Sequence, residues 1–227
     1  MPFTPYDHAV HTLDRARALL SGARAAGPTR RQTSDGRQGV RAARLPVPVR
    51  SDMRRLSIVM AVAALDAYMH RLIVARAYSH RKLPSKLARL DMTFEQLLAQ
   101  ADSAGAAARD KPTKPRFRVG VKRDLRDRLL RETYQSYDGV STALSMAGIS
   151  GGWGAIGTKM TPPLQPDEIK TRLNGIVRRR NQIVHEGDYE RSERPRKPKL
   201  ELAGAQSVSA DIDFIAELVD AIHAVAS

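Results

Sequence analysis

Three side chains near the end of one predicted helix could carry chemistry: Arg180, Asn181 and His185 in the string RRRNQIVHEGD. A guanidinium binds an anion through several parallel N–H donors, and an imidazole gains and loses a proton near neutral pH. Asn181 and His185 are four residues apart, so their side chains can touch across one helical turn. These residue types suggest a site that binds an anionic group and transfers protons, with Asn181 orienting the histidine or the anion.

Arg180 falls in the middle of the apolar stripe of this helix. At about 100° per residue, the apolar side chains of the helix lie within about 60° of it. They are Ile169, Leu173, Ile176, Val177, Ile183 and Val184. Because burying an unpaired guanidinium is costly, an arginine at such a position needs an anion, a partner charge or a path to solvent. His185 is about 140° away round the helix, so Arg180 and His185 do not share one face.

Structural interpretations stay open for each residue taken alone. Arg180 fits a salt-bridged core arginine, and His185 fits a helix-end histidine that the helix dipole stabilises. Asp66 interrupts an apolar segment, so it either forms a structural ion pair or positions Arg180 or His185 from a neighbouring helix. Arg178 and Arg179 lie farther round the helix and are expected to face water or phosphate as substrate-binding groups.

Other chemistries find little support in the sequence. It contains no cysteine, which excludes disulfides, thiolate nucleophiles and cysteine-ligated zinc. His8 and His11 stand at helical spacing without a third ligand nearby, so we interpret them as incidental. The string GISGGWGAIG lacks the Lys-Ser or Lys-Thr of a nucleotide-binding loop, and we interpret it as a flexible connection. No metal and no cofactor is expected.

The elements that position these residues are predicted to be helices. Aromatic residues make up only 5% of the sequence, whereas Ala, Leu and Arg are abundant, which favours helices over sheets. Apolar spacing and helix-start signals predict an all-α bundle of about five to six helices. These cover residues 6–24, 52–80, 93–107, 122–146 and 166–185, and a final helix follows Ser209 and Asp211.

We expect one helical domain at residues 51–227, with an N-terminal helix at residues 1–26 packed on it. Residues 27–50 between them are rich in arginine, proline and glycine without periodicity, and we interpret them as a basic flexible arm. Ser51 and Asp52 are expected to cap the helix that follows. Its stretch from Leu56 to Val74 approaches membrane-spanning length, but it contains charged residues and is interpreted as a buried core helix.

The charge of the chain points to a polyanionic partner. The formal net charge is +14, and such an excess raises the local concentration of nucleic acid and speeds its encounter with the protein. The N-terminal residues show no charged region leading into an apolar one, so no secretory signal is expected. We therefore expect a cytoplasmic protein that binds nucleic acid and does not enter a membrane.

The string RRRNQIVHEGD resembles the signature of the HEPN superfamily, especially its RiboL-PSP and MAE-type branches. That signature is an arginine, a polar residue, a few small or apolar residues, and then a histidine. In this sequence Arg180 and Asn181 begin it and His185 ends it, near the end of a helix. The string MAVAALDAYMHRL is similar to the early core helix of the family. The resemblance covers roughly residues 50–227.

The resemblance implies a helical bundle that pairs face to face, so that two Arg-His motifs meet in one composite cleft. It further implies a metal-independent endoribonuclease that uses the ribose 2′-hydroxyl as its nucleophile. Arg180 would bind the phosphate, and His185 would act as general base or acid. Such proteins often act as toxins or antiviral effectors, with a neutralising antitoxin protein as a partner.

Two alternatives stay open on the sequence alone. One is a non-catalytic HEPN module that binds RNA or a protein through the same surface. The other is a helical DNA-binding regulator, although no convincing helix-turn-helix pattern is present. The intact Arg180 and His185 favour the ribonuclease.

Overall fold

The computed structural model describes residues 3–25, 45–77, 85–88, 117–190 and 199–227. Within these ranges the chain forms helices joined by turns, with an isolated antiparallel bridge between Tyr189 and Leu200. The helices are α1 (Pro5–Ala25), α2 (Val47–Arg76), α3 (Ser85–Ala88), α5 (Phe117–Leu129), α6 (Tyr137–Met146), α7 (Gly152–Gly157), α8 (Pro166–Glu186) and α9 (Ala205–Ala226). The predicted all-α class is confirmed. The predicted helix at residues 93–107 lies outside the described residues.

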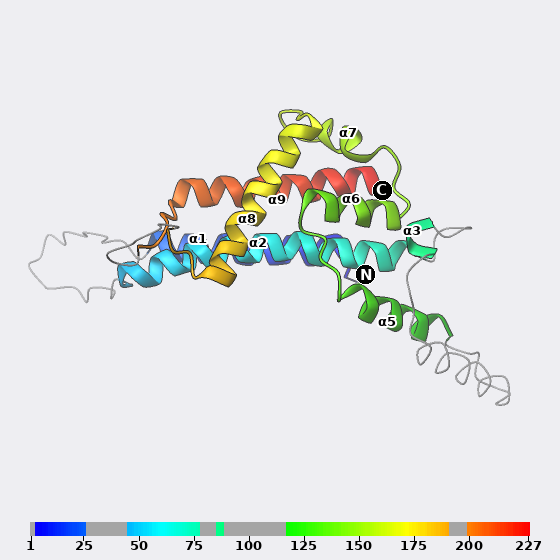
Figure 1. The fold of residues 1–227 in the computed structure, drawn as a ribbon, viewed down its shortest axis with the longest axis horizontal. Coiled ribbons are helices and arrows are strands. Elements are labelled where there is room, and N and C mark those ends of the chain that lie inside the picture. Colours follow the sequence, from blue (N-terminus) through cyan, green and yellow to red (C-terminus); the bar gives the residue numbers. More distant parts are fainter. Residues whose placement is uncertain (1–2, 26–44, 78–84, 89–116, 191–198) are drawn as a thin grey trace, which may run out of the picture.

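Helices α1, α2 and α9 lie side by side along the long axis of the molecule (Figure 1). α2 runs parallel to α9, and α1 runs antiparallel to both. At one end of α1 the ring of Tyr6 stacks on His223 with centroids 4.2 Å apart, and its hydroxyl donates to Asp220. At the other end Arg24 donates to the carbonyl of Ala205 at 3.0 Å. The N-terminal helix therefore belongs to the bundle itself.

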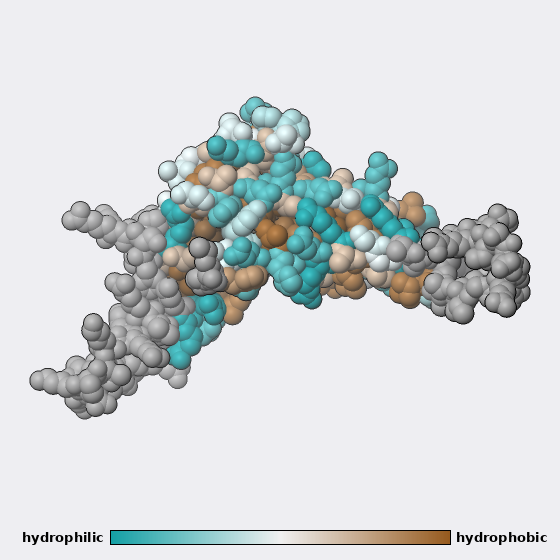
Figure 2. Space-filling view, turned by 180° about the vertical axis from the view of Figure 1, so that it is seen from behind, coloured by the Kyte–Doolittle hydropathy of each residue, from teal (hydrophilic) through white to brown (hydrophobic). Residues whose placement is uncertain are grey.

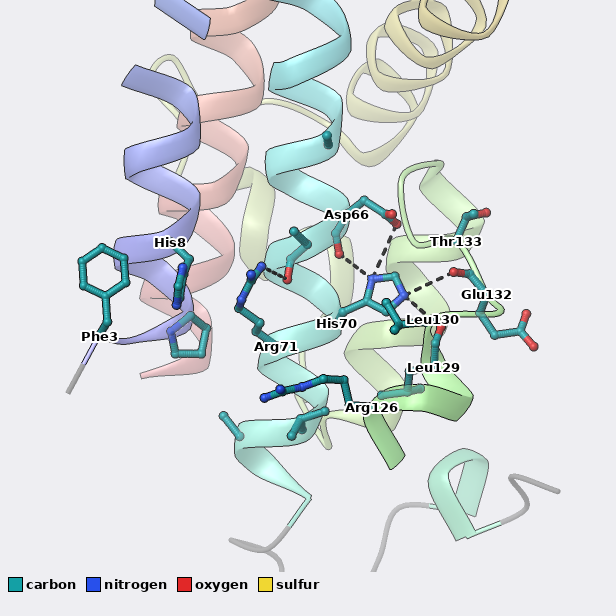
Figure 3. Close-up of a pocket in the computed structure, with 15 residues that line it drawn as sticks. Phe3, His8, Asp66, His70, Arg71, Arg126, Leu129, Leu130, Glu132 and Thr133 are labelled. Carbon is teal, nitrogen blue, oxygen red and sulfur yellow. Dashed lines mark hydrogen bonds and ion pairs between the residues drawn. The ribbon is translucent and has the colours of Figure 1, made fainter. Parts of the chain in front are cut away.

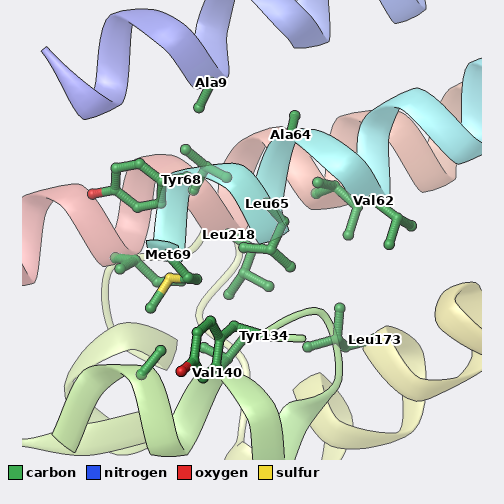
Figure 4. Packing of buried hydrophobic residues seen from close by; sticks show 14 of the residues in the cluster. Ala9, Val62, Ala64, Leu65, Tyr68, Met69, Tyr134, Val140, Leu173 and Leu218 are labelled. Atoms are coloured by element: carbon green, nitrogen blue, oxygen red, sulfur yellow. The ribbon is translucent and has the colours of Figure 1, made fainter. Parts of the chain in front are cut away.

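α2 is the central helix of the core. It contacts α1, α5, α6, α8 and α9, and the side chains of Leu65, Tyr68 and Met69 have almost no exposed surface. Figure 4 shows these residues in one buried cluster with Leu218 of α9 and Leu173 of α8. α2 is long and apolar enough to cross a membrane, but 56% of its most apolar window is buried inside the protein, as in a core helix. The interpretation of this segment as a buried core helix is consistent with that packing.

α2 begins earlier than predicted. Its first residue is Val47, and Pro46 and Pro48 lie in the N-cap and first turn, where a missing N–H costs nothing. The last residues of the predicted arm, 47–50, are therefore helical. Ser51 and Asp52, predicted to cap the helix, lie inside it and contact Arg55 one turn later. The rest of the arm, residues 27–44, lies outside the described residues.

The predicted helix at residues 122–146 is in fact two helices, α5 and α6, with a turn between them. The backbone N–H of Tyr134 in this turn donates to the carboxylate of Asp66 on α2 at 2.5 Å. Ser136 then caps α6, because its hydroxyl accepts from the N–H of Gly139. Apolar periodicity continues through the turn, since Leu129 and Tyr134 are both buried. This is why the sequence pattern resembles one helix.

The glycine-rich string, interpreted as a flexible connection, contains the short helix α7. Trp153 of α7 is buried, its ring stacks on Tyr137, and its N–H donates to Ser141 at 2.6 Å. Gly157 is needed because a Cβ atom there would lie 2.1 Å from the carbonyl oxygen of Leu164. Gly157 thus allows close packing between the end of α7 and the segment that leads into α8.

The described surface mixes apolar and polar side chains. Viewed from behind, brown apolar patches lie between teal polar side chains (Figure 2). Among the large apolar residues left exposed are Phe3 at 60%, Leu130 at 67% and Val184 at 48%. Val184 lies within the predicted motif on α8. Phe3 and Leu130 line a cleft beside the second half of α2.

Candidate active site

α8 carries the predicted motif, and both of its ends are well defined. Gln165 and Glu168 form a capping box, in which the N–H of Gln165 donates to the Glu168 carboxylate at 2.7 Å. Pro166 occupies the first turn, where its fixed φ suits a helix. At the other end Gly187 adopts the left-handed conformation, with φ 66°. The predicted start at Pro166 and stop at Gly187 are confirmed.

The apolar stripe of α8 is buried only up to Val177. Ile169, Leu173, Ile176 and Val177 pack into the core. One turn later Ile183 is partly buried, whereas Val184 is 48% exposed. The last turn of the stripe thus keeps an exposed apolar side chain in the part of the chain that the structure describes. Such an apolar strip at the end of a core helix suits a contact with a second molecule.

Arg180 lies where the buried part of the stripe ends. Its side chain is half-buried, and its Nη1 donates to the Oδ1 of Asn181 at 3.0 Å. Its Nε is buried and has no hydrogen-bond partner among the described residues. A buried guanidinium N–H without an acceptor is costly. Arg180 therefore has donor capacity that an anion could fill.

His185 is exposed in the last turn of α8. Within the described ranges no hydrogen bond or ion pair joins it to another residue. Asn181 was predicted to orient either this histidine or the anion, and the structure instead places its carbonyl on Arg180. Arg180 and Asn181 are thus brought together, while His185 stands free at the end of the helix.

A buried aspartate fixes the end of α8 to the core. Asp188 has no exposed surface and adopts a left-handed φ of 62°, which aspartate tolerates better than most residues. Its carboxylate accepts a hydrogen bond from the Nε of Arg55 on α2 at 2.5 Å. The same carboxylate is held by Arg179, with both N···O distances at 2.8 Å. This cluster anchors the residues that follow the motif.

Neither Arg55 nor Asp188 was predicted from the sequence to support the motif. Arg55 is buried, and its remaining donors bond the hydroxyl of Ser51 at 2.6 Å and the carbonyl of Glu201 at 2.8 Å. A signal was present, because Arg55 and Asp66 both interrupt the apolar pattern of α2. Nothing in the sequence indicates that its partner is the residue after the helix-ending glycine.

Arg178 and Arg179, predicted as substrate-binding groups, have different surroundings. Arg178 is exposed, as expected for a group that faces water or phosphate. Arg179 holds Asp188, and one of its nitrogens also lies 3.4 Å from the carbonyl of Leu202. Arg179 therefore serves an internal ion pair instead of facing the solvent.

Residues 188–190, which follow α8, pair with residues 199–201 through two antiparallel backbone hydrogen bonds. The N–H of Glu190 donates to the carbonyl of Lys199 at 2.7 Å, and the N–H of Glu201 donates to the carbonyl of Asp188 at 2.9 Å. Gln182 on α8 donates to the carbonyl of Tyr189 at 3.2 Å. Glu190 and Lys199, which flank residues 191–198, are therefore paired with each other near the end of α8.

Asp66 lies elsewhere on α2. Its carboxylate accepts the N–H of Tyr134 at 2.5 Å and lies 3.8 Å from the Nδ1 of His70. No contact joins it to Arg180 or His185 within the described part of the chain. The idea that Asp66 positions either residue is thus not supported, and its role is to fix the turn between α5 and α6.

One carboxyl group near the cluster has a shifted pKa. Burial raises the pKa of Asp211 on α9, and the nearby guanidinium groups of Arg172 and Arg179 partly oppose this shift. Arg172 itself lies over the ring of Phe214, 4.4 Å from its centroid. Arg172 of α8 therefore contacts α9, whereas Val184 and His185 are exposed in the described part of the chain.

Metal ligation has no basis in the described residues. In this part of the chain no group of three or more His, Cys, Asp or Glu side chains is close enough to hold an ion. The groups available for chemistry at the end of α8 are a guanidinium, an amide and an imidazole. These can bind an anion and transfer a proton.

The fold and the motif together define a class: a helical bundle with an arginine, an adjacent asparagine and a histidine in the last two turns of a core helix. The RiboL-PSP-HEPN family model matches residues 40–226. The chain belongs to this HEPN family, as the motif predicted. The match includes α2, α8 and α9 but not α1, which packs along α2 as an addition to it. No curated protein and no solved structure gives a significant match to the chain.

Proposed function

We propose that this protein is a metal-independent endoribonuclease whose site includes Arg180, Asn181 and His185. The observation that carries the proposal is the state of the last turns of α8. There a half-buried arginine keeps a donor without an acceptor among the described residues, and an exposed histidine follows five residues later. Membership of a family whose domains are often ribonucleases gives this pair a chemical role.

RNA supplies its own nucleophile, so the protein needs only to move protons and stabilise charge. One imidazole removes the proton of the ribose 2′-hydroxyl, and the 2′-oxygen then bonds to the adjacent phosphorus. The bond from phosphorus to the 5′-oxygen breaks, and an acid returns a proton to that oxygen. The products are a 2′,3′-cyclic phosphate and a 5′-hydroxyl. His185 performs one or both proton transfers.

Arg180 binds the scissile phosphate in this mechanism. Its unpaired donors can meet two phosphate oxygens and stabilise the charge that develops during attack. Asn181 holds the guanidinium through the 3.0 Å contact and so sets its direction. Arg178, exposed on the same helix, adds a phosphate contact outside the reacting group. Arg179 takes no direct part, because Asp188 occupies it.

We further propose that the site is completed by a second copy of the chain. The uncovered apolar turn around Val184 supports this, and so does the wide angle between Arg180 and His185 on the helix. In a twofold pair the arginine of one copy can serve the histidine of the other, and the basic groups of both meet in one cleft. A homodimer would thus contain the complete constellation.

The biological role that fits this chemistry is a toxin or antiviral effector that cuts RNA in the cytoplasm. A neutralising protein that covers the α8 end would be its natural partner. The strongly basic charge of the chain favours an RNA substrate.

The proposal is tested by incubating the purified protein with RNA in EDTA. Arg180→Ala and His185→Ala should each lower the rate of cleavage by about 100-fold or more, because each removes a group that acts in the transition state. Matched controls are Arg15→Ala and His11→Ala, two exposed residues of α1 that should leave the rate unchanged. Cleavage that requires added metal, or that survives in both variants, would contradict the proposal.

A non-catalytic HEPN module remains the second candidate, and one observation favours it. His185 has no residue in the described chain that orients it, whereas a catalytic histidine is usually held by a second group. If the wild type binds RNA in EDTA without cutting it, and Arg180→Ala weakens that binding, the protein is an RNA-binding module.

A further inference from the structure

A second feature of the molecule is a cleft of about 710 Å³ on the far part of α2. It lies between the start of α1, the second half of α2 and the end of α5 with the turn that follows (Figure 3). Its volume is within the range of about 300–1,000 Å³ that is typical of ligand sites. The motif on α8 does not line it.

The cleft is well separated from the proposed active site. Asp188, three residues after His185, is fixed to α2 at Arg55. Arg71 lines the cleft sixteen residues farther along the same helix, which corresponds to about 24 Å at 1.5 Å per residue. An RNA strand would have to extend along α2 to reach both places.

Two guanidinium groups in the cleft have no acid partner among the described residues. Arg71 and Arg126 both point into it (Figure 3). Arg71 contacts only the carbonyl of its own helix at Ala67, 3.3 Å away, and no acid pairs with Arg126 in the described ranges. The acids of the lining are already engaged: Asp66 accepts the Tyr134 N–H, and Glu132 pairs with Arg128 at 3.0 Å. With the Glu132–Arg128 pair counted as neutral, the cleft holds two guanidinium charges against the one carboxylate of Asp66.

The wall of the cleft is fixed by His70. Its Nδ1 lies 2.8 Å from the carbonyl oxygen of Asp66, and its Nε2 lies 2.9 Å from that of Leu129. The ring also packs on Tyr134, with centroids 4.8 Å apart. Burial raises the pKa of Tyr134 to about 12, so this phenol stays neutral. These contacts join α2 to the end of α5, so this wall of the cleft is already formed before a ligand binds.

Apolar side chains are exposed in the same cleft. Phe3 is 60% exposed and meets the ring of His8 edge-on, at 4.5 Å. Leu130 is 67% exposed. An exposed aromatic ring beside unpaired arginines is the arrangement that binds single-stranded nucleic acid, because bases stack on the ring while phosphates meet the cations.

We propose that this cleft is a second binding site for the RNA substrate, which holds an unpaired stretch away from the point of cleavage. Phe3 and Leu130 contact bases, and Arg71 and Arg126 contact phosphates. The inference rests on RNA being the ligand of the proposed function, but it does not require that Arg180 and His185 cut it.

The test is the affinity of the full-length protein for a short unstructured RNA with 2′-O-methyl groups, measured by fluorescence anisotropy in EDTA. This RNA cannot be cleaved, since its 2′-oxygens carry no proton. The double variant Arg71→Ala/Arg126→Ala should bind roughly tenfold more weakly, and the slope of log K against log salt should fall by about 1.4 for two lost phosphate contacts. Phe3→Ala should weaken binding by roughly 5- to 150-fold, as expected for a lost base–aromatic stack.

The matched control is Arg15→Ala/Lys159→Ala, which removes the same charge from exposed positions outside the cleft. An equal loss of affinity in this control would attribute the effect to overall charge and would overturn the proposal. Unchanged affinity in Arg71→Ala/Arg126→Ala and in Phe3→Ala would overturn it as well, and would leave the cleft to a different ligand such as a protein.

The two proposals fail separately in these experiments. If the cleft variants lose affinity while Arg180→Ala and His185→Ala leave cleavage unchanged, the catalytic assignment is wrong and the cleft remains an RNA site. If the cleft variants bind normally and Arg180→Ala abolishes cleavage, the reverse holds.

Discussion

Arg179 and Arg180 are neighbours in the sequence but have opposite environments in the fold. Arg179 holds the buried Asp188 with two contacts of 2.8 Å. Arg180 has only the amide of Asn181 and keeps a buried Nε without a partner. The first arginine ties the end of α8 to the core, and the second is left with donors that a ligand can use. Adjacent residues of one helix thus provide an internal ion pair and, in the proposed site, an anion-binding group.

Asp188→Ala should cause the largest loss in the free energy of unfolding, because Arg179 but not Arg180 depends on this carboxylate. Removing the carboxylate leaves Arg55 and Arg179 without their shared partner, and breaking a buried ion pair costs about 3–5 kcal/mol. Urea unfolding measures this loss. Asp52→Asn is the control: its side chain is 63% exposed, and a change of more than about 1 kcal/mol there would show that Arg55 depends on its other contacts.

The next largest effect should be the difference in the free energy of unfolding between Arg179→Ala and Arg180→Ala. Arg179→Ala should lower the free energy of unfolding by about 1.5–3 kcal/mol, since it removes charge-assisted bonds to a buried acid. Arg180→Ala should change it by less than about 1 kcal/mol, because the lost contact is offset by relief of an unpaired N–H. Equal losses measured by urea unfolding would mean that Arg180 is a structural residue.

Val184→Asp tests whether the uncovered turn of α8 is a contact between two copies. With 48% of Val184 exposed, the unfolding free energy of the protomer should change by only about 0.5 kcal/mol. Facing aspartates in a twofold contact should raise the dissociation constant by roughly 10- to 100-fold, measured by sedimentation equilibrium. Val47→Asp, at a residue 67% exposed in the first turn of α2, is the control. A wild type that is monomeric throughout would contradict the proposed dimer.

The smallest expected effect is on the pH dependence of stability. It concerns Asp211 of α9, which lies near Arg172 and Arg179 of α8. Its pKa is raised in the folded protein by burial, so the folded state binds its proton more tightly than the unfolded state does. Its contribution to stability is therefore largest below the unfolded pKa and is lost as the pH rises through the folded pKa. Asp211→Asn lacks this dependence, and its Tm relative to wild type should rise between about pH 4 and neutral pH. A relative Tm that falls over this range would mean that Arg172 and Arg179 outweigh burial.

The sequence predicted the elements better than their junctions. The apolar stripe and the caps of α8 gave its start and its end correctly, because they are local signals. The turn between α5 and α6 was missed, since it depends on a hydrogen bond from Tyr134 to Asp66, a residue 68 positions away. The start of α2 was missed because prolines suit a first turn as well as a loop.

The motif residues of the candidate site could be predicted from the sequence. The residues that fix the end of α8 to the core could not. Arg180, Asn181 and His185 follow from residue types and spacing within one helix. Asp188 bonds to Arg55 across 133 positions of sequence, and no local pattern indicates such a contact. For the same reason Arg179 was assigned to the substrate and Asp66 to the motif, whereas their partners are Asp188 and Tyr134.

The most direct test of the shared site is to co-express Arg180→Ala and His185→Ala chains with different tags and to assay the purified mixed pair with RNA in EDTA. Each variant alone should be inactive. If arginine and histidine come from opposite copies, the purified mixed pair should recover about half of the wild-type rate, since each mixed pair has one intact site of two. A wild type that cleaves RNA, beside a mixed pair as inactive as either variant, would contradict a site shared between two chains.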